Sequence, residues 1–191
     1  MAKIAEKTDE ILSMQHITKI YDNGFMANKD ITFSIRKGEI HGLVGENGAG
    51  KSTLMKVLFG QETAEEGRIL IDGKEVHITD PLAALDYGIG MVHQHFMLVP
   101  SLTVAENMVL GSEPKRGKLF FDYRKAVHMT RETAEKYGLE VNPEKRGMDL
   151  SVGYKQRVEI LKILLRGVRI LLLDEPTAVL TPQDTEELFP Q

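Results

Sequence analysis

The feature that most constrains the fold is a glycine-rich segment that fits the pattern GxxxxGK[ST] at every position. Its residues are Gly45, Glu46, Asn47, Gly48, Ala49, Gly50, Lys51 and Ser52. A strand-like apolar pattern at 40–44 precedes it and a helical pattern, 52–58, follows, which is the context that the motif requires. Since a glycine-rich turn without a ligand needs neither flank, we favour a phosphate-binding loop between a strand and a helix.

The spacing of this motif has a physical reason. Glycines let the backbone curve around a phosphate with consecutive N–H groups pointing inward, and the helix N-terminus adds positive potential. We expect Lys51 to reach the β- and γ-phosphates and the Ser52 hydroxyl to bind Mg²⁺. The segment predicts a nucleotide site.

A second motif follows the apolar run 170–173, a pattern typical of strands buried on both faces. Asp174 and Glu175 come directly after it. Such a strand would deliver Asp174 to the Mg²⁺ shell, and the Glu175 carboxylate could orient and deprotonate water. Two solvated acids at a strand end are the alternative, which the intact phosphate loop disfavours. The pair indicates hydrolysis of ATP more than transfer to a bound substrate.

Periodicity predicts strands around a helical middle, roughly residues 100–165. Apolar residues alternate over 31–35, and residues 69–78 indicate a hairpin around Asp72-Gly73. Residues 89–92 suggest a buried strand. The helix expected at 122–137 places Tyr123, Val127, Thr130, Ala134 and Tyr137 on one face, with Gly138 as its C-terminal cap.

Composition indicates one globular domain. The 191 residues are 42% hydrophobic, contain no cysteine and carry a formal net charge of −4. Without a basic patch or tract, nucleic acid is not an expected partner. The uncharged run 87–105 contains two His, a Gln and a Pro, which favours a buried strand and loop over a membrane span. The first ten residues lack the apolar core of a secretory signal.

A third motif, LSVGYKQRVEI at residues 150–160, resembles the LSGGQ signature of ATP-binding cassette (ABC) ATPases. DEPT at 174–177 is similar to their extended Walker B motif, and the resemblance covers essentially the whole chain. It implies an α/β P-loop core with an antiparallel β subdomain and a helical subdomain. It also implies that Ser151 and Gly153 contact the γ-phosphate held by an opposite domain. Taken alone, Ser151 would be a plausible helix N-cap.

The same resemblance implies the remaining site residues. Tyr21 matches the aromatic that stacks on adenine, although an isolated Tyr is more often a packing residue. Gln94 matches the Q-loop glutamine that touches Mg²⁺. His93 and His95 flank it, but without further ligands we favour strand-end polar residues over a metal pair. The implied catalytic residues are Glu175, Gln94 and Lys51. The implied metal ligands are Ser52, Gln94 and Asp174. Thr53 joins the loop and the signature residues in binding ATP.

Some positions depart from the family pattern. Val152 and Tyr154 replace a Gly and the Gln of LSGGQ, and Thr181 stands where many relatives carry an Asp. Thr181-Pro182 also predicts a helix start. The stretches 93–111, 150–167 and 174–183 look most like the first cassette of the tandem ATPases in bacterial simple-sugar and nucleoside importers.

That resemblance implies ATP and Mg²⁺ as cofactors, transmembrane permease subunits and a second ABC domain as partners, and a peripheral place on the cytoplasmic face of the membrane. None of the six His follows residue 175, where the family carries a switch histidine. We therefore expect residues 1–191 to be one incomplete nucleotide-binding domain of a longer ATPase, without its final core strand. An ATP-binding module with little turnover and a soluble ABC protein acting on ribosomes or DNA are the alternatives.

Overall fold

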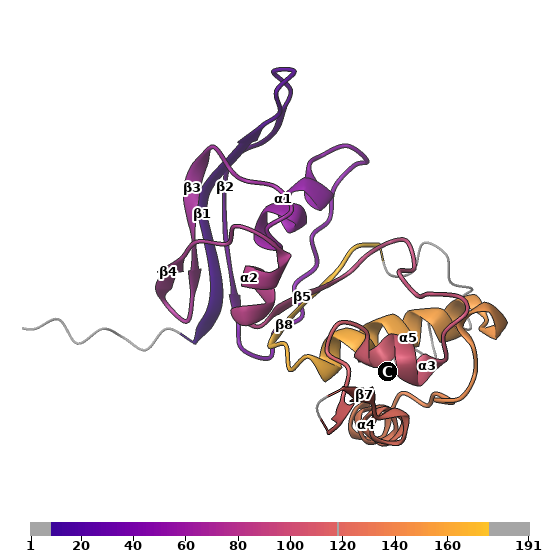
Figure 1. Cartoon of the computed structure of the whole chain (residues 1–191). Coiled ribbons are helices and arrows are strands. Elements are labelled where there is room, and N and C mark those ends of the chain that lie inside the picture. Colours follow the sequence, from indigo (N-terminus) through magenta and orange to yellow (C-terminus); the bar gives the residue numbers. More distant parts are fainter. Residues whose placement is uncertain (1–8, 118, 176–191) are drawn as a thin grey trace, which may run out of the picture. The chain divides into compact units, whose positions relative to one another are not determined.

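The computed structural model describes residues 9–117 and 119–175 (Figure 1). The chain divides into two compact units, one ending at Tyr87 and the other beginning at Gly88. We call them the N-terminal unit and the C-terminal unit.

The N-terminal unit is built on a four-stranded antiparallel sheet with strand order β2-β1-β3-β4. Its elements in chain order are β1 (Glu10–Ile20), β2 (Met26–Arg36), α1 (Lys51–Leu58), β3 (Glu66–Ile71), β4 (Lys74–Val76) and α2 (Pro81–Asp86). The helices α1 and α2 lie along the same side of the sheet (Figure 1). Leu12, Met14 and Ile17 of β1 are fully buried, so the central strand forms the core.

Two predicted strand features are confirmed in this unit. The alternating run 31–35 lies in β2, which pairs with β1. The hairpin of β3 and β4 turns at Asp72 and Gly73, whose φ angles of 48° and 75° are those of a two-residue turn with the twist that hairpins favour.

The two helices of this unit start in different ways. A side-chain cap begins α2, because the Asp80 carboxylate accepts hydrogen bonds from the backbone N–H of Leu82 and Ala83. These hydrogen bonds lower the pKa of Asp80 below its usual value, and the one from the Ala83 N–H has the largest effect. Gly50 begins α1 without any side-chain cap, in the left-handed conformation. The first four N–H groups of α1 therefore face the loop before it without a capping side chain.

The strand expected at 40–44 is wrong for this structure. Residues 39–44 form neither strand nor helix, and Ile40 and Val44 are 100% and 93% exposed. A strand needs a hydrogen-bonded neighbour, and no strand of the N-terminal unit, as far as it is described, pairs with this run. The apolar pattern alone does not create the element.

The C-terminal unit combines helices with two short pairs of strands. Its elements are β5 (Ile89–Val92), α3 (Val104–Val109), β6 (Lys115–Arg116), β7 (Phe120–Phe121), α4 (Tyr123–Tyr137), the 3₁₀ turn η1 (Gly147–Asp149), α5 (Val152–Leu165) and β8 (Ile170–Leu173). β5 and β8 are parallel, with Ile89 opposite Ile170 and Val92 opposite Leu173. The expected burial of β8 on both faces holds only for alternate residues, since Leu171 and Leu173 are half-buried.

The predicted helix at 122–137 is confirmed as α4. Asp122 caps its start by accepting from the Lys125 N–H, and Gly138 ends it with φ 66°. Val127, Thr130 and Ala134 are buried as the pattern indicates. Tyr137 is 39% exposed instead, because it is the last helical residue and extends beyond the packed face.

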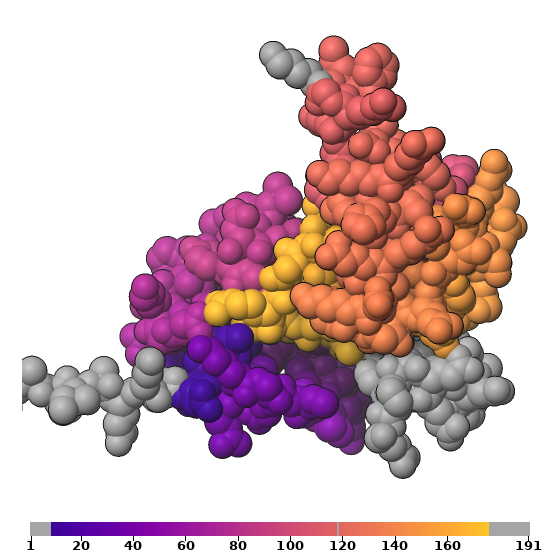
Figure 2. Space-filling view, turned by 90° about the horizontal axis from the view of Figure 1, so that it is seen from below, coloured from indigo at the N-terminus to yellow at the C-terminus, as the bar shows by residue number. Residues whose placement is uncertain are grey.

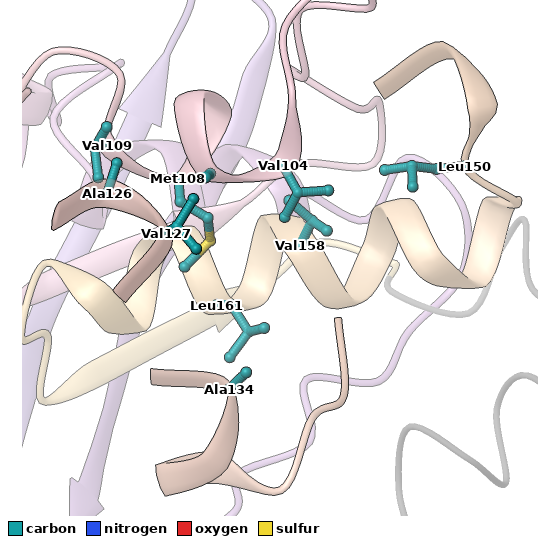
Figure 3. Packing of buried hydrophobic residues seen from close by; sticks show 10 residues of the cluster. Val104, Met108, Val109, Ala126, Val127, Ala134, Leu150, Val158 and Leu161 are labelled. Carbon is teal, nitrogen blue, oxygen red and sulfur yellow. The ribbon is translucent and has the colours of Figure 1, made fainter. Parts of the chain in front are cut away.

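The core of the C-terminal unit lies where α3, α4 and α5 meet. Figure 3 shows Met108 of α3 and Val127 of α4 facing Val158 and Leu161 of α5. Met108, Val158 and Leu161 are fully buried. The β6–β7 hairpin projects from these helices in Figure 2, and its Leu119 is 87% exposed. The three helices fall within the range 100–165 expected to be helical, while the assignment of the whole chain as one domain stays a prediction.

Among the described residues, no helix combines the length and the apolar character that crossing a bilayer requires.

Replacing Leu161 by Ala should lower the free energy of unfolding by about 2–5 kcal/mol, because the cavity opens in the packed centre of three helices. The matched control is Leu119→Ala, the same change at an exposed position, with an expected effect within about 0.5 kcal/mol. Urea unfolding of both variants measures the difference. Similar midpoints for the two variants would contradict the described core.

Candidate functional site

The glycine-rich loop is held against strand β2 by close backbone packing. Gly50 has φ 87°, and a Cβ at this position would lie 2.2 Å from the Ala27 carbonyl oxygen. Gly48 also has a positive φ, 83°. Side chains other than glycine would therefore be strained at both positions, and at Gly50 they would also collide with β2. These two glycines give the loop its tight curve.

The side chain of Lys51 spans the loop that it follows. Its Nζ donates to the carbonyl oxygens of Gly45 and Glu46, each at 2.8 Å. The ammonium group of Lys51, which is predicted to contact phosphate, thus lies over the start of the loop, and Lys51 itself is the first residue of α1. An ammonium group and a helix N-terminus at one place form an anion-binding arrangement.

Asn28 of β2 supports this loop and was not predicted from the sequence. It is 6% exposed, and its Nδ2 donates to the Gly50 carbonyl at 3.2 Å, an oxygen that also accepts from the Leu54 N–H. Its Oδ1 is buried without a hydrogen-bond partner among the described residues. The only available signal was an Asn inside a strand, where that residue type is depleted.

Tyr21, the predicted adenine-stacking residue, lies beside the phosphate loop. It directly follows β1 and is half-buried, and its hydroxyl is 3.3 Å from the Thr53 hydroxyl in the first turn of α1. The structure therefore brings together Tyr21, the loop 45–52 and Thr53 in the N-terminal unit.

Gln94 and Glu175 form the corresponding group in the C-terminal unit. The register that sets Val92 opposite Leu173 puts each of them two residues beyond the paired strand ends. Gln94 Nε2 lies 3.4 Å from Glu175 Oε2, and the Asp174 N–H donates to the Val92 carbonyl at 3.1 Å. Predicted separately, these residues meet at the carboxyl edge of two parallel strands.

Glu175 has an unusual backbone conformation. Its φ of 48° is left-handed, which few non-glycine residues adopt. A strained backbone persists only where the surrounding structure holds it in place, and such positions are frequent at functional sites. The exposed Glu175 carboxylate lies beside the Gln94 amide.

The signature segment forms the N-terminal part of α5. Ser151 is the N-cap of α5 and accepts a hydrogen bond from the Tyr154 N–H at 3.4 Å. The N-cap role expected of Ser151 is therefore confirmed, while its contact with the γ-phosphate of an opposite domain stays a prediction. Val152 and Gly153 occupy the first turn, with Val152 41% exposed and Gly153 buried. The Tyr154 hydroxyl accepts a hydrogen bond from the Asn142 N–H.

The predicted metal ligands are divided between the units, with Ser52 in one and Gln94 and Asp174 in the other. Hydroxyl, amide and carboxylate oxygens are the donors that Mg²⁺ prefers, so the residue types fit the ion. Within the described ranges, no three His, Cys, Asp or Glu side chains gather as a metal site would require. Thr181 and Pro182 lie outside the described residues.

Comparison with known proteins shows that the similarity covers most of the chain and not only the motifs. A family model described as "ABC transporter" matches residues 28–178. The guanosine import ATP-binding protein NupO of Bacillus subtilis is 52% identical over 180 residues, 94% of this chain and 35% of NupO. The nucleoside import ATP-binding protein NupA of Lactococcus lactis is 49% identical over 181 residues, 95% of this chain and 35% of NupA. The chain thus spans about a third of these relatives.

A solved structure shows the same fold. CbiO1 of Clostridium perfringens, described as part of the ABC transporter complex cbiONQ, is 30% identical to this chain with a TM-score of 0.78. The match covers 94% of this chain and 71% of CbiO1. With its P-loop core, antiparallel β sheet and helices, the chain belongs to the ABC transporter family.

Proposed function

We propose that this chain is the nucleotide-binding part of an ATPase that energises import of a small solute, a nucleoside or a simple sugar, through a membrane permease. The observation that carries the proposal is the loop in which Gly50 packs on β2 while Lys51 Nζ spans the loop carbonyls. That arrangement suits a triphosphate at the N-terminus of α1.

In this proposal the residues of the N-terminal unit bind ATP. Lys51 contacts the phosphates, the loop N–H groups surround them, and Tyr21 stacks on adenine from its place beside Thr53. Ser52, Gln94 and Asp174 would hold Mg²⁺, which supplies positive charge to the phosphates when bound. The fit rests on the donor types described above.

Residues of the C-terminal unit would carry the chemistry. Glu175 orients and deprotonates the attacking water, and Gln94, 3.4 Å from that carboxylate, holds it in place. Ser151 and Gly153 would act on the γ-phosphate of an opposite cassette. A second ABC domain, bound in tandem or as a dimer, completes the site, and the permease places the assembly on the cytoplasmic face of the membrane.

The nucleoside class is favoured by the relatives that are named for guanosine and nucleoside import. In this architecture the permease and a binding protein select the solute, so uptake by the assembled importer is the direct test. Cells should take up labelled guanosine only when the importer is present. Uptake of a labelled pentose in its place would assign the importer to sugars.

Lys51→Ala should weaken Mg-ATP binding at least tenfold, because it removes the charged donor nearest the loop. At 100 times the Kd, Mg-ATP should stabilise the wild-type fold by about 2.7 kcal/mol, seen as a shift in thermal unfolding. Lys56→Ala is the control, the same change on the same helix, α1, and should keep the shift. A shift that survives Lys51→Ala unchanged would contradict the proposed phosphate site.

In the assembled importer, Glu175→Gln should lower ATP turnover by roughly 10²–10⁴ while leaving ATP affinity nearly intact, as expected for loss of a positioned general base. Mg-dependent phosphate release and nucleotide binding are measured on the same sample. Glu135→Gln, on the exposed side of α4, is the control and should retain turnover. Equal rates for wild type and Glu175→Gln would remove Glu175 from this role.

A further inference from the structure

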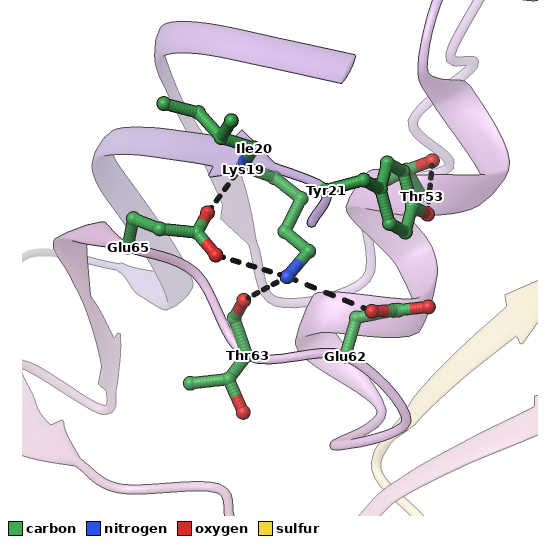
Figure 4. A network of polar contacts seen from close by, with 7 residues as sticks. All are labelled: Lys19, Ile20, Tyr21, Thr53, Glu62, Thr63 and Glu65. Atoms are coloured by element: carbon green, nitrogen blue, oxygen red, sulfur yellow. Dashed lines mark hydrogen bonds and ion pairs between the residues drawn. The ribbon is translucent and has the colours of Figure 1, made fainter. Parts of the chain in front are cut away.

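A buried lysine lies behind the predicted base-binding tyrosine. Lys19, in β1, is 8% exposed. Its Nζ donates to the Thr63 carbonyl at 2.8 Å and to Glu65 Oε1 at 3.0 Å, and Glu62 Oε2 is 3.7 Å away. Figure 4 shows these groups converging on the ammonium from the segment that follows α1. A buried charge is retained only with such partners.

The carboxylates hold Lys19 in its charged form. Burial alone would lower the pKa of Lys19, but the hydrogen bond and charge of Glu65 and the charge of Glu62 raise it above its usual value. The pKa of Glu65 is lowered, first by the backbone N–H of Ile20 and also by Lys19. At neutral pH the ammonium next to Tyr21 is therefore a permanent charge.

Lys19, Glu65 and Thr53 hold Tyr21 from three directions. Lys19 Nζ lies over its ring, 5.3 Å from the centroid. Glu65 Oε2 accepts from the N–H of Ile20, the residue just before Tyr21, at 2.5 Å. Thr53 contacts the hydroxyl at the far end of the ring. Ring face, backbone and ring tip are all held by residues of the N-terminal unit (Figure 4).

We propose that Lys19, held by Glu62 and Glu65, is a positioning residue for the nucleotide base: it occupies one face of Tyr21 and so presents the opposite face to adenine. The cation also draws ring electron density toward itself, which favours an electron-rich base on the other face. This inference rests on the proposed function, because it assumes that Tyr21 stacks on the base.

The competing role is purely structural, a clamp between β1 and the segment 62–65. A clamp would support the phosphate loop and the base site alike. A positioning residue that acts through Tyr21 affects only ligands that carry a base. Mg-ATP and Mg-tripolyphosphate share the phosphate chain and differ in the nucleoside, so the pair separates the two roles.

The experiment measures the Kd of both ligands by calorimetry for wild type, Lys19→Met and Tyr21→Ala. Lys19→Met should weaken Mg-ATP binding about threefold to tenfold and leave tripolyphosphate binding unchanged. Lys37→Met, which breaks an exposed ion pair with Asp72 on the same sheet, is the control and should change neither Kd. An equal loss for both ligands, or no loss for Mg-ATP, overturns the proposal.

A double-mutant cycle tests whether Lys19 acts through Tyr21. In the Tyr21→Ala background, Lys19→Met should have no further effect on Mg-ATP binding. If Lys19→Met weakens Mg-ATP binding equally with and without Tyr21, the inference about Lys19 is overturned and the proposed function is not affected. If Tyr21→Ala itself leaves Mg-ATP binding unchanged, the base site of the proposed function is wrong and this inference fails with it.

A milder change covers the case in which Lys19→Met does not fold. Glu65→Gln keeps a hydrogen-bonding group of the same size but removes the charge that holds Lys19. Glu65→Gln should weaken Mg-ATP binding by less than Lys19→Met does, and it should leave tripolyphosphate binding unchanged. The chain has no Trp, so Tyr21→Trp adds a single reporter whose fluorescence Mg-ATP should quench and tripolyphosphate should not. An equal loss for both ligands in Glu65→Gln overturns the proposal about Lys19, whereas equal fluorescence responses of Tyr21→Trp to both ligands show that the base site of the proposed function is wrong.

Discussion

The contact between Gly50 and the backbone of β2 is the constraint on which the nucleotide site depends. No side chain fits there, since a Cβ would lie 2.2 Å from the Ala27 carbonyl. Because Gly50 is also the N-cap of α1, the contact fixes where the helix starts and where its N–H groups point. Asn28 reinforces it by donating to the Gly50 carbonyl. The strand thus sets the position of the anion-binding end of the helix.

The position of Tyr21 depends on the same sheet. Tyr21 follows β1, which lies between β2 and β3 in the sheet, and contacts Thr53 in the first turn of α1. The buried Lys19 of β1 links this tyrosine to the segment after α1 through Glu62 and Glu65. Phosphate loop and tyrosine are therefore attached to adjacent strands of one rigid sheet, which keeps their separation fixed.

The position of Gln94 beside Glu175 depends on strand register. Gln94 and Glu175 are far apart in sequence and meet only because β5 and β8 run parallel with Val92 opposite Leu173. Side chains just beyond the carboxyl ends of adjacent parallel strands share one edge, the usual place of α/β sites. Glu175, which has a left-handed φ, has its carboxylate at this edge beside Gln94.

The sequence by itself determined the local elements and the motifs. The glycine-rich loop, the hairpin around Asp72, the C-terminal cap of α4 at Gly138 and the interest of Lys51 and Glu175 all followed from patterns within a few residues, whereas Gln94 was named only through the family resemblance. Tertiary structure decided the rest: that residues 39–44 form no strand here, that Asn28 supports the loop, and that Lys19 lies behind Tyr21. These outcomes depend on pairing and burial between distant segments, which local periodicity does not encode.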